Sequence, residues 1–365
     1  MNLGILLFPN SNGSLEGSEA STWKHMIRYA KTYNMHVSLL NASTFDRHIH
    51  SFDVIWDRAR WQNSTQFTSF FKSRKRVFHQ STEERGPIWM NGPFINKWAF
   101  HRRFVHRAAA LGICFPQTFH WEDLQNQTIN LASRSTRWYV KPVNGTGGRG
   151  ILLLEKHGRT ILCTGSDEKR NKRKWLLDSD RHMHSMIKHW ITSPFNAMYG
   201  QNYIIQQAVD TRLSDGRVHD FRLLVQKDRT GEWCVSGIGA RIGGSGQNGS
   251  NLHAGGSCCS FDEFSQELWS QKKLQFIRGQ LMKTALAIAK LCDGSPSYQC
   301  EFGCDLAVGP TGDIFVLELN PKPGRKLFTQ ISDREAFEFT HTRPIDYAMW
   351  LYHERQLHKE TSKRK

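Results

Sequence analysis

Residues 140–155, VKPVNGTGGRGILLLE, place a glycine-rich loop between two runs that favour β-strands. The glycines are Gly145, Gly147, Gly148 and Gly150. Because glycine lacks a Cβ atom and adopts positive φ without steric cost, the backbone N–H groups of such a loop can approach phosphate oxygens. Lys141, on the strand before the loop, would supply a compact positive charge to the same phosphates. The segment predicts a flexible hairpin that covers a nucleotide; an ordinary hairpin turn with a bulge is the alternative.

The composition is that of a globular protein with an excess of positive charge. The chain has 365 residues, of which 39% are hydrophobic and 22% charged, so two or three domains are expected. Lysine and arginine total 49 against 33 aspartate and glutamate, a formal net charge of +16. Such an excess favours anionic partners, which include nucleotide phosphates, nucleic acid and acidic polymers.

The amino-terminal sequence, MNLGILLFPNSNGS, has an apolar run too short for a signal peptide core or a membrane span. The eight cysteines lack zinc-finger spacing and are interpreted as buried thiols of a reducing compartment, with a redox or metal role as the alternative. We therefore expect a cytoplasmic protein with no membrane partner.

The first quarter of the chain reads as a small α/β layer. Residues 3–8, 36–41 and 52–59 have the composition of strands, and residues 18–34 have helical spacing. No GxGxxG follows any of these strands, so a dinucleotide site is not indicated.

Farther along the chain, apolar spacing predicts helices over 96–111 and 265–292. Further strands are expected at YIIQQAV, FRLLVQ, WCVSGIGARIG and IFVLEL, with a hairpin between the second and third. The basic run 167–175, DEKRNKRKW, is interpreted as a solvated loop, with a nucleic-acid site as the alternative. The basic tail, QLHKETSKRK, is expected to be frayed.

A second group of polar residues lies in CDLAVGPTGDIFVLELNPKPGR. Glu318 and Asn320 are two residues apart on one expected strand, so their side chains share a face. Together with Asp305 they offer a small set of hard oxygen ligands, which suits Mg²⁺ rather than zinc. An exposed polar pair is the alternative for Glu318 and Asn320.

Four motifs occur in order: K-P-x-x-G-x-x-G-x-G, D-F-R, S-N-L-H-x-G-G and L-E-x-N-x-x-P-G-R. In this order they resemble the ATP-grasp superfamily, and within it the YheC/YheD-type proteins of spore-forming bacteria, over about residues 96–325. The resemblance is weaker to the ligases that add glutamate to a ribosomal protein. It implies a mixed α/β and α+β fold, in which a small α/β pre-grasp domain precedes an ATP-grasp fold of two α+β subdomains. The expected boundaries are 1–95 for the pre-grasp domain, 96–200 for the subdomain with the glycine-rich flap, 201–350 for the subdomain with the metal site, and 351–365 for the basic tail.

The resemblance also implies roles for residues at the nucleotide. Lys141 and Lys97 match lysines that contact the phosphates, and residues 144–150 resemble the mobile flap that closes over them. Residues 206–209 lie where the inter-subdomain linker binds adenine through backbone groups, and Asp210 is assigned to the ribose hydroxyls. Many relatives have glutamate where this chain has Gln207. The implied nucleotide contacts are thus Lys97, Lys141, Asn144, Gly145, Gly147, Gly148, Gly150, Gln206, Gln207, Val209 and Asp210.

Further roles concern catalysis. Arg222 of the D-F-R motif resembles the arginine that stabilises the transferring phosphoryl group; a surface arginine on a strand is the alternative. Asn251 and His253 lie in a loop that related ligases place beside the metals and the acceptor, and an ordinary glycine-rich loop is the alternative there. Arg325 matches a position that could hold a substrate carboxylate. The magnesium ligands implied by the match are Asp305, Glu318 and Asn320.

The function implied is that of an ATP- and Mg²⁺-dependent carboxylate–amine ligase acting through an acyl-phosphate, with both the carboxylate substrate and the amine acceptor unknown. The alternative is an ATP-binding structural or vestigial component of the bacterial spore coat, with spore coat proteins as partners. A third hypothesis, nucleic-acid binding through the run KRNKRK, has no helix-turn-helix, zinc or RNP-type signature to support it.

Overall fold

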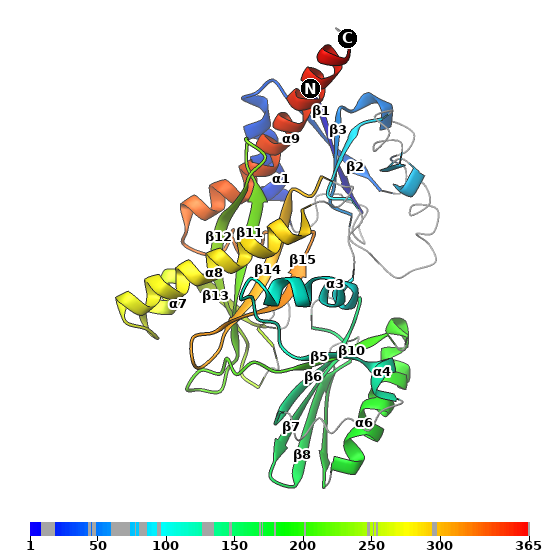
Figure 1. Ribbon diagram of the computed structural model, residues 1–365, viewed down its shortest axis with the longest axis vertical. Helices are drawn as coiled ribbons and strands as arrows, with labels where there is room; N and C mark the ends of the chain where they lie inside the picture. Colours follow the sequence, from blue (N-terminus) through cyan, green and yellow to red (C-terminus); the bar gives the residue numbers. More distant parts are fainter. Residues whose placement is uncertain are drawn as a thin grey trace.

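The described residues form three β-sheets. In Figure 1 the sheet of β1–β4 lies near the top, the sheet of β11–β15 in the middle and the sheet of β5–β10 at the bottom. The computed structural model describes the whole chain apart from residues 9–18, 43–44, 46–48, 60–73, 77, 80–85, 93–95, 126–134, 146–147, 168, 170, 179, 201, 247–248, 251, 253–254, 294–297 and 364–365. Within the described chain no helix is both long and apolar enough to cross a membrane.

The first sheet is parallel, with strand order β2-β1-β3-β4. Its elements are β1 (Asn2–Leu7), α1 (Ala20–Lys31), β2 (His36–Asn41), η3 (Ile49–Ser51), β3 (Val54–Asp57) and β4 (Ile88–Met90). Alternation along β1 turns Leu3 and Ile5 toward α1 and toward the last helix of the chain, α9 (Arg334–Lys363). Figure 1 shows α9 lying beside α1. The carboxyl-terminal helix thus completes the core of the amino-terminal sheet.

The second sheet has six antiparallel strands in the order β5-β10-β6-β7-β8-β9. Its elements are β5 (Thr118–His120), α4 (Trp121–Gln125), β6 (Arg137–Pro142), β7 (Ile151–His157), β8 (Thr160–Ser166), β9 (Lys172–Leu177), α6 (Asp180–Thr192), η5 (Pro194–Tyr199) and β10 (Tyr203–Gln207). Val140, Leu152 and Cys163 line one face and pack against Trp190 of α6. The opposite face carries Lys141 and looks toward the third sheet.

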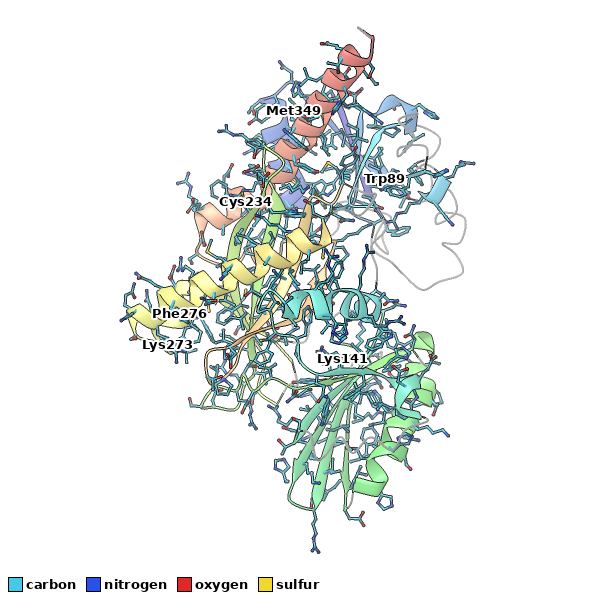
Figure 2. The ribbon with its side chains drawn as sticks, in the orientation of Figure 1. Trp89, Lys141, Cys234, Lys273, Phe276 and Met349 are labelled. Carbon is cyan, nitrogen blue, oxygen red and sulfur yellow. The ribbon has the colours of Figure 1, made fainter. Side chains whose placement is uncertain are left out.

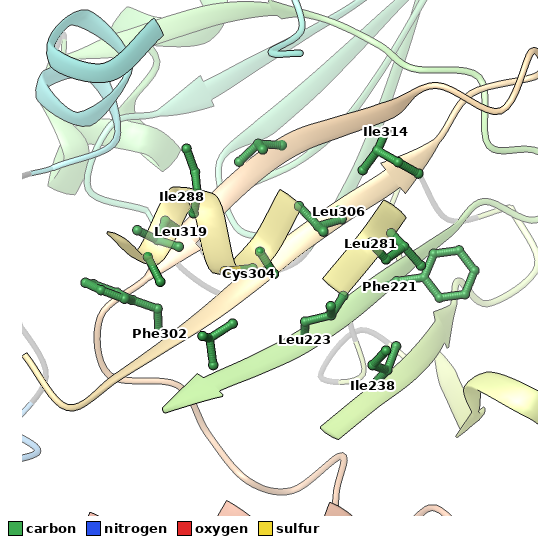
Figure 3. Close-up of a cluster of buried hydrophobic side chains, with 14 of the residues drawn as sticks. Phe221, Leu223, Ile238, Leu281, Ile288, Phe302, Cys304, Leu306, Ile314 and Leu319 are labelled. Carbon is green, nitrogen blue, oxygen red and sulfur yellow. The ribbon is translucent and has the colours of Figure 1, made fainter. Parts of the chain in front are cut away.

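The third sheet is antiparallel, in the order β13-β12-β11-β14-β15. Its elements are α3 (Lys97–Ala109), β11 (His219–Lys227), β12 (Trp233–Ile242), β13 (Ser257–Ser260), α7 (Phe261–Gln266), α8 (Gln271–Cys292), β14 (Glu301–Val308) and β15 (Ile314–Asn320). Figure 3 shows the apolar face, where Phe221, Leu223 and Cys304 pack against Leu281 and Ile288 of α8. Because side chains alternate along a strand, the residues between them form a polar face on the other side.

Several expectations differ from the structure in their details. The predicted helix 265–292 is two helices, because Ser260 and Glu263 form a capping box that begins α7 early, and Ser270 adopts extended backbone (ψ 154°) before α8. The run 167–175 is not simply a loop: β9 takes its second half and pairs with β8.

The carboxyl-terminal part also differs. Residues 356–363 of the tail that was expected to fray continue α9. Arg355, just before them, donates from Nη1 to Gly86 O at 2.7 Å, and the segment is rich in good helix formers. The strand β10, beyond the expected boundary at 200, belongs to the second sheet.

Candidate functional site

A row of charged side chains crosses the polar face of the third sheet. Arg222, Asp305 and Glu318 lie opposite one another on β11, β14 and β15. Arg222 Nη2 donates to Asp305 Oδ2 at 3.0 Å, and Arg222 Nε donates to Asp305 Oδ1. Asn320 Nδ2 donates to Asp305 Oδ2 at 3.3 Å. The structure therefore brings Arg222 together with the three expected magnesium ligands.

Two residues of this face, Asp220 and Arg241, were not singled out from the sequence. Arg241 on β12 donates from Nε and Nη2 to the two oxygens of Asp220, each at 2.7 Å, and its Nη2 lies 3.0 Å from Asp305 Oδ2. Burial favours the neutral form of Asp305, but Arg222 and Arg241 outweigh it and lower the pKa of this carboxyl group. The hairpin register, which sets Asp220 opposite Arg241, is the signal that would have found this arginine.

The expected magnesium ligands offer only oxygen atoms, the kind of ligand that a hard cation prefers. In the described chain no group of three or more histidine, cysteine, aspartate or glutamate side chains forms a metal site. The candidate set consists of two carboxylates and one amide, a hard-oxygen set that leaves positions for phosphate and water. Asp305 also accepts hydrogen bonds from Arg222 and Asn320, so these donors share its oxygens.

Two lysines from separate elements meet at this face. Asn96 caps α3 by accepting a hydrogen bond from Ala99 N at 2.9 Å, which fixes Lys97 at the first turn. Lys97 Nζ donates to Gly145 O at 2.6 Å and lies 3.5 Å from Glu318 Oε1. Lys97 thus connects the glycine-rich loop to the third sheet.

Lys141 lies on the facing sheet. Its Nζ donates to Gln206 Oε1 at 2.5 Å, and Gln206 Nε2 donates to Thr118 Oγ1 at 3.1 Å. Burial lowers the pKa of Lys141 to about 8; Lys97 contributes in the same direction and Glu318 opposes it. An added anion would therefore stabilise the charged lysine.

A pocket between the second and third sheets contains both lysines, and Figure 2 labels Lys141 where β6 faces α3. A bulge in β15 sets Leu317 outside the pairing with β14, and this side chain lines the pocket. The lining residues are Asn96, Lys97, Phe100, His101, Phe115, Thr118, Lys141, Ile204, Gln206, Leu317, Glu318 and Leu319. Apolar and aromatic walls with two cations suit a ligand that has a flat apolar part and an anionic part.

The predicted glycine loop joins β6 to β7. Asn144 is exposed and Gly148 has φ 76°. Gly150 has φ 68°, and a Cβ atom there would lie 2.7 Å from the ring of Tyr199. Gly147 lies outside the described residues. The backbone at Gly150 thus requires glycine for both conformation and space.

The expected adenine segment, residues 206–209, begins in the last two residues of β10 and continues beyond it. The N–H groups of Gln207 and Ala208 donate to Gln117 O at 2.8 Å and Arg137 O at 3.1 Å. Among the described residues, the N–H of Val209 donates to no backbone carbonyl. Asp210 is exposed and is held by Arg212 and Arg137. The hydrogen bond from Arg212 is the main cause of the lowered pKa of Asp210.

Arg325 lies apart from this group. It is fully buried, donates from Nη2 to Glu301 Oε2 and from Nε to Thr340 O at 2.8 Å, and its guanidinium lies 5.1 Å from the ring centroid of Trp56. These contacts give it a packing role and do not support binding of a substrate carboxylate. Asn251 and His253 lie outside the described residues.

A sequence profile described as YheC/D like ATP-grasp matches residues 87–351. The chain belongs to the YheC/D-like ATP-grasp family. Endospore coat-associated protein YheD of Bacillus subtilis (strain 168) is 26% identical over 301 residues, which cover 82% of this chain and 63% of that protein. The chain therefore spans less than two thirds of the length of this relative. The expected family resemblance is confirmed.

Solved structures confirm the ATP-grasp fold. D-cycloserine synthetase DcsG has a TM-score of 0.55 at 14% identity, covering 97% of this chain and 99% of that one. The macrocyclase MdnC of Microcystis aeruginosa MRC, bound with precursor peptide MdnA, has a TM-score of 0.53 at 9% identity, covering 93% and 98%. The chain has the fold expected from the motifs, a small α/β domain followed by ATP-grasp α+β sheets.

Proposed function

We propose that this YheC/D-like ATP-grasp protein binds ATP with Mg²⁺ between its second and third sheets and joins a carboxylate to an amine. The observation that carries the proposal is the convergence of Lys97 and Lys141, from different elements, on a pocket that also contains Glu318. Two cations and oxygen donors at one end of an apolar pocket suit a purine triphosphate with its metal.

In this proposal the base lies against Leu317 and Ile204, and the N–H of Val209 binds it. Lys97 and Lys141 contact the phosphates, and the backbone of the loop 144–150 covers them. Asp210 reaches the ribose only by sharing its oxygens with Arg212.

Asp305, Glu318 and Asn320 would hold Mg²⁺, which supplies charge compensation to the β- and γ-phosphates when bound. A substrate carboxylate oxygen attacks the γ-phosphorus, the bond to the β-phosphate oxygen breaks, and an acyl-phosphate and ADP result. The amine then displaces phosphate and loses a proton. Arg222 and Arg241, held beside Asp305, stabilise the charge of the transferring group.

The second candidate is an ATP-binding component of the spore coat without ligase activity. It is favoured by the name of the relative YheD, an endospore coat-associated protein. Magnesium-dependent ADP formation that requires a carboxylate separates the two candidates. A broad screen of carboxylates and amines in which no mixture raises ADP above background would favour the coat component.

Mg·ATP is expected to raise the melting temperature of the wild type. At about one hundred times its Kd, a ligand stabilises the folded state by roughly 2.7 kcal/mol, a shift of a few degrees in a chain of this size. Lys141→Ala should diminish the shift because it removes a phosphate contact, whereas the exposed Lys283→Ala on α8 should retain it. An unchanged melting temperature of the wild type with Mg·ATP would contradict the proposed nucleotide site.

Mg·ATP affinity is expected to depend on pH through Lys141. Its pKa of about 8 means that the ammonium is charged below pH 8 and neutral above it. Triphosphate binding prefers the charged form, so the affinity should be nearly steady up to about pH 7.5 and fall above pH 8, by up to about thirtyfold at pH 9.5. Isothermal titration from pH 7 to 9.5 measures this change. Lys141→Arg, which stays charged, should give a flat profile; equal slopes in the two proteins would contradict the assignment.

A further inference from the structure

The far edge of the second sheet carries a short basic strand with one side unpaired. The strand β9 (Lys172–Leu177) pairs with β8, and no other described strand pairs with its outer edge. Lys172, Arg173 and Lys174 are all exposed. Leu176 is 72% exposed, the most exposed of the large apolar side chains that the structure describes. The edge thus offers backbone hydrogen-bonding groups, positive charge and one apolar contact together.

The two lysines of this strand share a face with the nucleotide site. The register joins Tyr139, Leu153, Thr164 and Lys174 in one row across four strands. Lys141 is two residues from Tyr139 and so lies on the same face. Three strand spacings of about 4.8 Å separate β6 from β9, which makes roughly 14 Å.

The opposite face of β9 is already occupied. Trp175 packs edge-on against Trp190 with ring centroids 5.7 Å apart. Arg173 Nη2 lies 3.6 Å from Oδ2 of the buried Asp167. No ion pair between described residues uses Lys172 or Lys174. The charges available to a partner are therefore those of Lys172 and Lys174, on the face toward the nucleotide site.

We propose that β9 is a docking strand for an acidic, extended peptide segment, which adds to the edge of the second sheet. An added strand satisfies the outward backbone groups of β9, and its alternate acidic side chains meet Lys172 and Lys174 while an apolar one covers Leu176. A second copy of this chain is a poor occupant, because its own β9 would bring the same cations to the contact.

A nucleic acid fits this edge less well. Bases bind single-strand sites by stacking on exposed aromatic rings, and the aromatic ring of this strand, Trp175, is packed against Trp190. A strand edge presents alternating donors and acceptors, which match a peptide backbone.

If the protein is the proposed ligase, the docking strand would hold a peptide substrate, and this inference about the substrate rests on the proposed function. A peptide that carries the substrate carboxylate and is held at β9 must cover roughly 14 Å to reach Lys141. An extended chain covers about 3.3 Å per residue. The acidic segment and the reacting carboxylate would thus be separated by at least about four residues. The substrate would then be recognised through a segment that lies apart from the reacting carboxylate.

The test is fluorescence anisotropy, in the absence of nucleotide, with a labelled ten-residue peptide in which threonine alternates with glutamate and one glutamate is replaced by leucine to cover Leu176. The full chain should bind it, and a peptide with lysine in place of glutamate should not bind. Reversing both charges, Lys172→Glu with Lys174→Glu, should weaken binding at least about tenfold, since two ion pairs become repulsive. Lys272→Glu with Lys273→Glu, exposed at the start of α8, changes net charge equally and should stay within about twofold of wild type.

Hydrogen exchange supplies the backbone readout, because edge pairing should slow the amides of β9 when the peptide is bound. The proposal is overturned by absence of binding at 1 mM peptide, by equal losses in the two double variants, or by unchanged exchange in β9. It is also overturned if a ten-nucleotide single-stranded DNA binds more tightly than the peptide and loses affinity in the β9 variant. Failure of the Mg·ATP temperature shift would count against the ligase proposal alone, since the peptide assay contains no nucleotide.

Discussion

Replacing Glu301 by glutamine is expected to lower the free energy of unfolding by about 3–5 kcal/mol, the range found when one partner of a buried ion pair is removed. Glu301 is fully buried on β14, where its Oε1 accepts from Arg58 Nη1 at 2.5 Å and its Oε2 from Arg325 Nη2. The amide of glutamine would leave two buried guanidinium groups with Glu19, 4.0 Å from Arg58 Nη2, as their nearby carboxylate.

The loss should be large because this ion pair network joins distant parts of the chain. Arg58 follows β3 of the first sheet, and Arg325 follows β15 of the third. Arg58 Nη2 also donates to Pro323 O at 2.7 Å, and Asn91 Nδ2 donates to Glu301 Oε1 at 3.3 Å. Glu301 thus lies where the first and third sheets meet.

Urea unfolding followed by far-UV circular dichroism measures this effect. Glu267→Gln, an exposed position just after α7, makes the same chemical change at the surface and should cost less than about 0.5 kcal/mol. If Glu301→Gln cost no more than this control, the buried network would not contribute to stability as argued.

Arg222→Ala is expected to slow ADP formation by about 10²–10³ once an acceptor that supports turnover is found, the cost of removing one preorganised donor from a transition state. Asp305 would keep its contact with Arg241, whose Nη2 lies 3.0 Å from Asp305 Oδ2, so the sheet should still fold. The rate measured at saturating Mg·ATP isolates this step from nucleotide binding.

The matched control is Arg217→Ala. Arg217 is a partly exposed arginine whose Nε lies 2.6 Å from Asp215 Oδ2, and it does not belong to the charged row. This variant should keep the wild-type rate. Arg222→Lys should recover part of the activity, because lysine keeps the charge but cannot make two parallel hydrogen bonds to Asp305. An Arg222→Ala rate within threefold of wild type would assign Arg222 to packing of the sheet.

Features that depend only on residues close together in the sequence could be predicted from local sequence patterns. The loop between β6 and β7 was predictable because glycines between two strand-like runs have few other uses. Glu318 and Asn320 share a face because alternation along a strand needs no tertiary information.

Features that depend on register or on packing were not predictable in the same way. Arg241 joins the site through its pairing opposite Asp220, which requires knowledge of the hairpin register. The strand β9 forms from residues of low β propensity because β8 supplies a partner. Arg325 is close in sequence to Asn320, but burial against Trp56 takes its side chain away from the polar face.

The helix α9 has a consequence for synthesis of the chain on the ribosome. The core of the first sheet joins Leu3 and Met90 to Tyr347 and Leu351, so the strands of this sheet are completed by residues that are made much later. At about 5–20 residues per second, the roughly 255 residues between Met90 and α9's first core contact take about 13–50 s to translate. During that time α1 can cover its part of the apolar side of the nascent sheet, but the part that α9 covers is open to water and to chaperones. A translation product that stopped before residue 334 would keep this exposed surface permanently and would be a target for proteolysis.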